Sequence, residues 1–444
     1  MNRLKNSVLF VICLVTGTQG IICCHTGSKT EERPVKENTD NPPTSEALPS
    51  GMELVWSDEF NGTFLDRDKW FTDYYSTIDF VKKSNYGKLQ SGKLPQPGIR
   101  FTGHSIILYT DSEVPAEAYS PEGRKISSIQ TYDWKEDKLL LDNRLGGFIE
   151  ARIKRSCTAD ATIVNGAFWL DSPGPDAKYF MEKGNKAYQV TGIRPHGQVF
   201  EIDLCEHLNT EIVLHGNVSS EGVFEHNIGH FPIAGDYMDK WTTHSMLWSP
   251  AGFKFYVDGR LVKEDWDPHN IKSPNHAMNV LLGIYAKGGV ASMEVDYIRY
   301  YRWKLEGSNE LPNPGFEYHN GLFPWEGNGS VTASSSRTGK RGVRLAANDS
   351  IIQYVYLDHS RPYSMKFRHK GSGYVTAKVE NISQVSGIAV NCSGSVFKSG
   401  EDFRQDEIRF STDPEYGNHK RTVKVIFINT GTAPISLDDI TIEP

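Results

Sequence analysis

The segment 200–207 constrains the fold most, because it sets three carboxylates into an otherwise apolar run that reads as a β-strand. Side chains alternate between the two faces of a strand, so Glu201 and Asp203 point the same way. Glu206 is out of phase with them, and one extra residue near positions 204–205 would return it to their face as a β-bulge. The spacing therefore predicts a bulged strand with one acidic face.

This acidic face has two interpretations. The first is a polar edge strand whose acids are solvated or paired with Lys and Arg. The second is catalysis, because splitting a glycosidic bond needs one carboxylate as nucleophile and one carboxylic acid as proton donor. Ile202 and Leu204 would form an apolar opposite face that is buried in the core. Burial of that face fixes the register of the strand, and the register in turn fixes the face on which the acids lie. This pattern favours catalysis.

The composition predicts an all-β protein of two domains. A chain of 444 residues is long for one domain. Short β-branched or alternating runs recur, with Gly, Asn, Asp and Pro between them, at 126–131, 148–153, 280–285 and 423–428. The formal net charge of −7 argues against nucleic acid as the main partner.

The N-terminus reads as an export signal over residues 1–24, with a positive start and an apolar run too short to span a bilayer. Cys23 and Cys24 suggest a lipoprotein in which one Cys is acylated and anchors the chain to an outer membrane. Plain secretion, or release into the periplasm, is the alternative. Residues 25–50 are polar and predict a disordered tether.

The remaining cysteines do not form a disulfide framework. Cys157 and Cys205 could pair if their strands are neighbours, but we favour both as small buried apolar residues, and Cys392 is left over. The Cys and His spacings do not resemble a zinc site.

The acidic segment resembles the catalytic signature of glycoside hydrolase family 16, in its bulged form. The resemblance covers about Glu53 to Trp303. Other pieces of that family's pattern follow in the expected order: Val55–Gly62, Gly147–Arg152, Ala167–Leu170, Trp241–Trp248, Phe255–Gly259 and Val295–Tyr301. The resemblance implies a β-jelly-roll catalytic domain over residues 51–304, an open cleft and a retaining endo-hydrolase that needs no cofactor for catalysis.

The resemblance also implies roles for the three acids. Glu201 is expected to be the nucleophile and Glu206 the general acid/base, which has to hold a proton at rest. Asp203, between them, is expected to position Glu201. In a retaining enzyme the two catalytic carboxyl groups lie about 5–5.5 Å apart.

Further residues are candidates for binding. Phe168 and Trp169 must face opposite ways, so only one of them can be core. The resemblance implies that Trp169 lies in the cleft and offers an aromatic face to a sugar ring, and a core Trp is the alternative. His215 and His244 are weaker cleft candidates. The resemblance also implies that Glu59 and Asp296 could hold a structural calcium ion through carboxylate oxygens, and ordinary ion pairs to Arg or Lys are the alternative.

A linker at 305–312 is expected to lead into a second, smaller domain over residues 313–444. Its opening Asn313–Glu317 and closing Leu437–Ile440 resemble the end strands of a carbohydrate-binding β-sandwich. The alternative is a sandwich that only packs against the catalytic domain, and fold does not imply function. Glu317 with Asp439 raises a second, weaker calcium site there.

The substrate is expected to be an extracellular polysaccharide cleaved by a monomeric enzyme. The Gly-Trp-Pro stretch usual before the catalytic Glu in the family's β-1,3-glucanases is replaced by residues 194–200, which favours a β-galactan of the agar, porphyran or carrageenan type over a glucan. Two basic loops could contact an anionic glycan, with Lys82, Lys83, Lys88 and Lys93 in one and Lys178, Lys183, Lys186, Arg194 and His196 in the other. Ordinary solvated surface loops are the alternative. A β-1,3- or mixed-linkage glucanase is the first alternative, and a non-catalytic glycan-binding lipoprotein is the second.

Overall fold

The computed structural model describes residues 46–74, 95–116, 123–173, 199–217, 224–266, 273–319, 321–382 and 389–444, and for 217 and 224–228 the backbone alone. The described residues are organised in strands and turns, with one short 3₁₀ segment, η2 (Ala333–Ser335), and no α-helix among them. The all-β prediction is confirmed. Among these residues, no helix has the length and apolar character to cross a membrane.

The first domain contains an antiparallel sheet of eight strands, in the order β14-β13-β12-β7-β16-β3-β2 with β1 also paired to β16. Its strands are β1 (Met52–Asp58), β2 (Gly98–Phe101), β3 (Ile106–Thr110), β7 (Gly147–Cys157), β12 (Thr242–Ser249), β13 (Gly252–Val257), β14 (Arg260–Trp266) and β16 (Ala291–Trp303).

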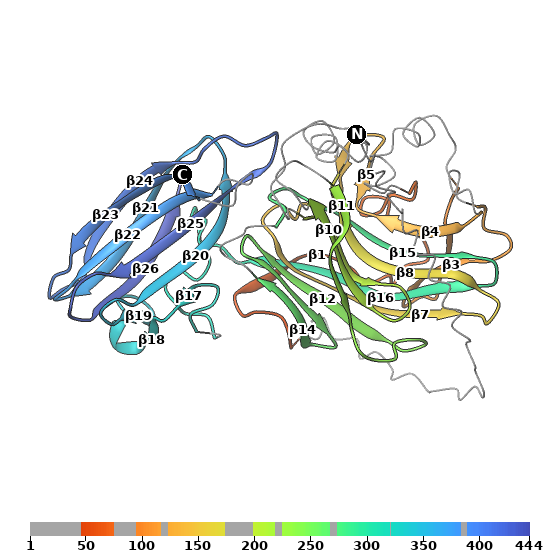
Figure 1. Cartoon of the computed structure of the whole chain (residues 1–444), viewed down its shortest axis with the longest axis horizontal. Coiled ribbons are helices and arrows are strands. Elements are labelled where there is room, and N and C mark those ends of the chain that lie inside the picture. Colours follow the sequence, from red (N-terminus) through yellow and green to blue (C-terminus); the bar gives the residue numbers. More distant parts are fainter. Residues whose placement is uncertain are drawn as a thin grey trace, which may run out of the picture.

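A second sheet of six strands, in the order β11-β10-β9-β8-β15-β4, lies against the first (Figure 1). Its strands are β4 (Lys125–Gln130), β8 (Thr162–Asp171), β9 (Val199–Glu206), β10 (Glu211–Asn217), β11 (Phe224–Pro232) and β15 (Asn279–Lys287). A small hairpin of β5 (Tyr132–Asp133) and β6 (Lys138–Leu139) follows β4. The two large sheets form a β-jelly-roll.

The main core lies between the two sheets. Ile149, Ala151 and Ile153 of β7 belong to the same buried cluster as Phe168 and Leu170 of β8. Alternate side chains therefore meet between the sheets, as the period of two requires. The opposite faces of these strands are left for other contacts.

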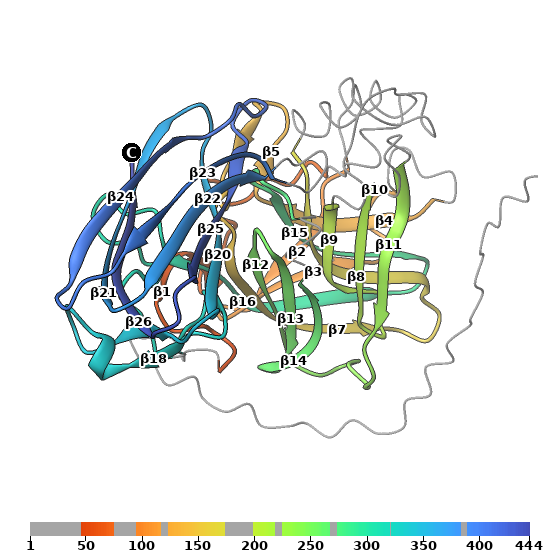
Figure 2. The same ribbon diagram turned by 60° about the vertical axis from the view of Figure 1, so that its left-hand side comes forward.

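The second domain is a sandwich of two antiparallel five-stranded sheets with its own core (Figure 2). One sheet has the order β17-β20-β25-β22-β23, and the other β18-β19-β26-β21-β24. The strands are β17 (Glu326–Gly327), β18 (Ser330–Thr332), β19 (Gly342–Leu345), β20 (Ser350–Asp358), β21 (Pro362–Gly371), β22 (Tyr374–Ile382), β23 (Ala389–Lys398), β24 (Arg404–Ser411), β25 (Lys420–Asn429) and β26 (Ile435–Glu443).

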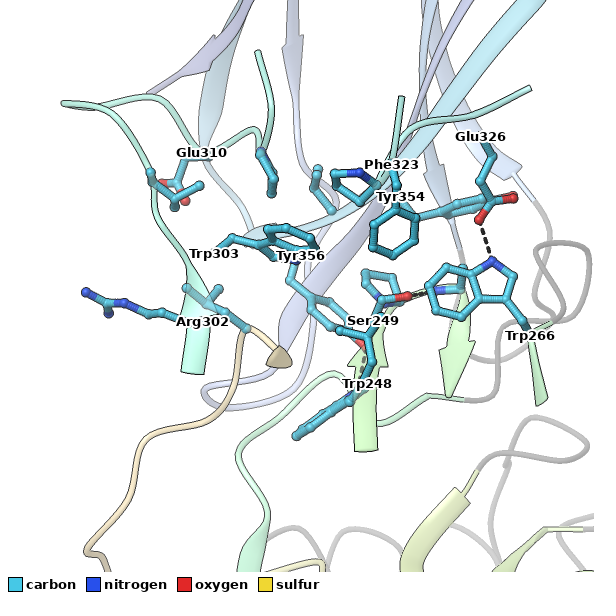
Figure 3. A pocket seen from close by; sticks show the side chains of 18 residues that line it. Trp248, Ser249, Trp266, Arg302, Trp303, Glu310, Phe323, Glu326, Tyr354 and Tyr356 are labelled. Atoms are coloured by element: carbon cyan, nitrogen blue, oxygen red, sulfur yellow. Dashed lines mark hydrogen bonds between the residues drawn. The ribbon is translucent and has the colours of Figure 1, made fainter. Parts of the chain in front are cut away.

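The two domains meet through aromatic side chains at the outer face of β20 (Figure 3). The Tyr356 hydroxyl donates a 2.7 Å hydrogen bond to the Pro274 carbonyl and accepts one from the Trp248 indole at 3.3 Å. The Trp266 indole donates to the Glu326 carboxylate across the same junction. Because buried hydroxyl and indole groups find partners in the other domain, this contact is specific rather than incidental.

Candidate active site

The acids at 201, 203 and 206 lie on β9, with β8 on one side and β10 on the other. Asp203 is opposite Trp169 of β8, whereas Cys205 is opposite Phe168, so Leu204 has no partner in the register. The register against β10 shifts over the same residues. The bulge therefore falls at positions 204–205, where the spacing of the acids predicted it.

The core explains why the bulge turns Glu206 outward. Ile202, Leu204 and Cys205 are all buried in the cluster between the sheets. Two consecutive inward side chains at the bulge move the next residue to the opposite face, which already carries Asp203. We call the surface of the six-stranded sheet that bears Glu201, Asp203 and Glu206 the acid face.

Two of the acids are nearly covered on this face. Glu201 is 7% exposed and lies opposite His215 of β10, and Asp203 is 3% exposed. Burial raises the pKa of Asp203 well above its usual value, and the nearby charge of Glu206 raises it further. Asp203 therefore holds its proton more tightly than a solvated carboxylic acid.

His215, a predicted binding residue, lies among these acids. Its Nε2 is 3.4 Å from Asp203 Oδ2. Burial lowers the pKa of His215 from 6.5 to about 4, against the opposing charge of Glu206, so its imidazole is neutral near neutral pH. Ligand atoms of Glu201, Asp203 and His215 lie within 4.8 Å of one another, close enough to share one cation.

Glu206 is held by a residue that sequence reasoning missed. Asn165 of β8 donates from Nδ2 to Glu206 Oε1 at 2.9 Å and to the Tyr285 hydroxyl at 2.7 Å. Its Oδ1 accepts the backbone N–H of His207 at 2.6 Å. The available signal was a polar Asn two residues before the Ala167–Leu170 motif.

His207 lies close to Glu206, although consecutive residues of a regular strand face opposite ways. Its Nε2 is 3.7 Å from Glu206 Oε2 and 3.8 Å from a Glu211 carboxylate oxygen. The strand ends at Glu206, and His207 has φ +57°, so strict alternation no longer applies at this position.

The aromatic candidate Trp169 lies on the acid face. It packs with Ala167, Leu281 and Tyr74, whereas its neighbour Phe168 is fully buried in the main core. Because Trp169 is directly opposite Asp203 in the β8–β9 register, its indole lines the surface beside the acids.

The structure does not bring His244 to this group. His244 lies on β12 of the eight-stranded sheet and is fully buried. It shares its face of the strand with Met246 and Trp248, which belong to the core between the sheets. Burial, and then the charge of Arg155, lowers the pKa of His244 well below its usual value. Sequence spacing alone could not tell which sheet would receive it.

Glu59 and Asp296 follow the ion-pair alternative rather than calcium binding. Glu59 accepts two hydrogen bonds from Arg299, at 2.8 and 2.7 Å, and Asp296 accepts one from Arg152 at 2.9 Å. Because guanidinium groups already neutralise both carboxylates, the pair does not fit a calcium site in this arrangement.

The weaker calcium pair of the second domain is also engaged by the protein. Glu317 Oε1 accepts the backbone N–H groups of Lys340 and Arg341, and Asp439 pairs with Arg337 at 3.0 Å. Cys205 is buried, as favoured from the sequence, whereas Cys157 is only half-buried and Cys392 is exposed. The two basic loops, apart from their ends, and the export signal lie outside the described residues.

The chain is similar to known glycoside hydrolases. Residues 185–302 match the family model described as Glycosyl hydrolases family 16. A keratan-sulfate endo-1,4-beta-galactosidase of Sphingobacterium multivorum is 23% identical over 478 residues, covering 99% of this chain and 99% of the relative. A glucan endo-1,3-beta-glucosidase A1 of Niallia circulans is 26% identical over 305 residues, covering 59% of this chain and 39% of that protein.

Among solved structures, a GlcNAcα1-4Gal-releasing endo-β-galactosidase from Clostridium perfringens matches with a TM-score of 0.41 and 17% identity, covering 71% of this chain and 81% of the other. The chain is similar to several endo-glycosidases, and its acid face carries the carboxylates that such chemistry needs.

Proposed function

We propose that this chain, a glycoside hydrolase of family 16, is a retaining endo-β-galactosidase that cleaves internal bonds of an extracellular galactose-containing glycan. The observation that carries the proposal is the bulge at 204–205, which gathers Glu201, Asp203 and Glu206 on one face. A protein that only binds glycan has no need of three acids kept together against their mutual repulsion.

The proposed roles follow from the surroundings of each acid. Glu201, nearly covered, attacks the anomeric carbon as a carboxylate. Glu206, with its side chain 21% exposed, gives a proton to the leaving oxygen and afterwards takes one from water. Burial raises the pKa of Asp203 and so favours its protonated form beside Glu201. In that form it adds less repulsion and can donate a hydrogen bond to the nucleophile.

Support for a galactosidic bond comes from the extent of the likeness. The match to the keratan-sulfate endo-β-galactosidase runs through both domains, whereas the match to the glucan endo-1,3-β-glucosidase covers 59% of this chain. The replaced Gly-Trp-Pro stretch also favours a galactan. A glucanase is the second candidate, because that relative is slightly more identical over its shorter span.

The test is digestion of a panel of purified keratan sulfate, agar, porphyran, carrageenan, laminarin and mixed-linkage glucan, with sizing of the products and assay of new reducing ends. We expect a ladder of oligosaccharides from one galactose-containing glycan. Release from laminarin or mixed-linkage glucan alone would establish the glucanase. Binding without new reducing ends from any substrate would refute the enzyme.

Glu201→Gln is the matched control for this assay, because an amide is nearly isosteric but cannot form the glycosyl ester. We expect hydrolysis to be abolished with fold and glycan binding intact. Proton NMR of the first product should show the β anomer. An initial α anomer would mean that the carboxylates act by inversion, with Glu201 in another role.

We also propose that the protein is exported and tethered at the cell surface through Cys23 or Cys24. Metabolic labelling with an alkynyl fatty acid tests this, with Cys23→Ser and Cys24→Ser variants as controls. Absence of label in the intact chain would favour plain secretion.

A further inference from the structure

Asn165 joins three groups at the end of β9: the Glu206 side chain, the following backbone N–H of His207 and the Tyr285 hydroxyl. Asn165 is itself 3% exposed on β8, so its own side chain has little freedom. Glu206 ends its strand, and the next residue already departs from strand geometry. Asn165 is therefore the contact that fixes where the Glu206 carboxyl lies.

The hydrogen bonds define the orientation of the Asn165 amide. A backbone N–H can only donate, so the atom facing His207 has to be Oδ1. Nδ2 then faces Glu206 and Tyr285 and uses both of its protons. In a flipped amide, Nδ2 would face the backbone N–H of His207, so that two donors would meet. Oδ1 would then face Glu206 Oε1, so that two acceptors would meet.

This orientation distinguishes the two oxygens of Glu206. Oε1 receives an N–H and, when Glu206 is protonated, acts as the carbonyl oxygen. The acidic proton then belongs on Oε2, whose described neighbour is His207 Nε2 at 3.7 Å, beyond hydrogen-bonding distance. Oε2 is thereby left for the substrate.

We propose that Asn165 is a positioning residue for the acid/base: it holds Glu206 Oε1 so that the catalytic proton is delivered and recovered through Oε2. This rests on the proposed role of Glu206. In the first step the O–H bond at Oε2 breaks and its proton joins the leaving glycosidic oxygen. In the second step Oε2 takes a proton from the attacking water, while Asn165 stabilises the carboxylate through Oε1.

Asn165→Asp is the informative substitution, because it keeps an oxygen for the His207 N–H but replaces the donor to Glu206 by a second carboxylate. Two carboxylates in contact hold a proton more tightly than one. We expect the alkaline limb of the kcat/KM profile to move up by at least about half a pH unit. We expect kcat to fall about tenfold to hundredfold on polysaccharide, and less on aryl glycosides with good leaving groups.

Asn381→Asp is the matched control. Asn381 is also 3% exposed, accepts a backbone N–H (Asp413) and donates to a carbonyl (Ser411), but it lies in the second domain. The Asn381→Asp variant should be less stable than the wild type, but its kcat/KM profile against pH should not move. Tyr285→Phe, which removes only the other acceptor of Asn165, should leave the alkaline limb in place.

Thermal melts and labelling of Glu201 by a 2-deoxy-2-fluoro glycosyl inhibitor give the fraction of folded, competent enzyme. If folded Asn165→Asp keeps the wild-type alkaline limb and leaving-group dependence, the proposal is wrong. If Glu201→Gln and Glu206→Ala are both fully active, the proposed function itself fails. If they are inactive while Asn165→Asp resembles wild type, only the positioning role fails.

Discussion

Asp203 shows at the scale of one residue how this site opposes stability. Its pKa is raised by burial and by Glu206, so the folded state binds its proton more tightly than the unfolded state. Stability is then lost as pH rises above the usual carboxyl value of 3.8. We predict that Asp203→Asn raises Tm at pH 7 by a few degrees, with a smaller gain near pH 4, while kcat falls about a hundredfold. Melts at both pH values check this, and an equal or negative shift at pH 7 would contradict it.

His215 has the opposite dependence. Its pKa is depressed from 6.5 to about 4 by burial, so the unfolded chain binds a proton more readily. The stability associated with neutral His215 is present above pH 6.5 and is lost as pH falls toward 4, amounting to about 3 kcal/mol at most. We predict that His215→Gln flattens the decline of unfolding free energy between pH 6.5 and 4. The exposed His104→Gln should keep the wild-type slope, and denaturant titrations at stepped pH measure both.

The residues that could be predicted from sequence are those fixed by local alternation. Glu201 and Asp203 share a face because they are two apart on a strand, and the phase of Glu206 indicated the bulge. Asn165 could not be found this way, because its contact with Glu206 depends on how β8 pairs with β9. His244 illustrates the same limit, since spacing does not say which sheet a strand joins.

The bulge can be tested at the scale of the element. Leu204 and Cys205 both point inward, so removing one restores plain alternation and leaves Glu206 on the acid face. We predict that deleting Cys205 gives a folded enzyme with reduced but measurable hydrolysis. Deleting Ile202, outside the bulge, turns Asp203 toward the core and should abolish folding and activity. Circular dichroism and reducing-end assays separate the two, and equal loss in both deletions would contradict the bulge argument.

At the scale of the whole molecule, two β domains were predictable from length and turn-rich patterning, but their junction was not. Tyr354 and Tyr356 alternate with core residues on β20, and in sequence they could equally face solvent or a sugar. The structure covers them with the first domain, at 9% and 4% exposure. Which surface an aromatic residue meets across a domain boundary depends on the placement of both domains, which no local pattern encodes.

Tyr356 gives the matching prediction. Its hydroxyl bridges the Pro274 carbonyl and the Trp248 indole of the first domain. Tyr356→Phe leaves both groups without this partner, at a cost of about 1–3 kcal/mol. If the junction couples the domains, the intact chain unfolds in one calorimetric transition, and the variant lowers that whole transition by roughly 1 °C per kcal/mol. Tyr374→Phe, at a tyrosine 45% exposed on the same domain, should leave it unchanged. Two separate transitions in the wild type, or a variant that shifts only one, would show that the second domain is an independent appendage rather than part of the catalytic domain's structure.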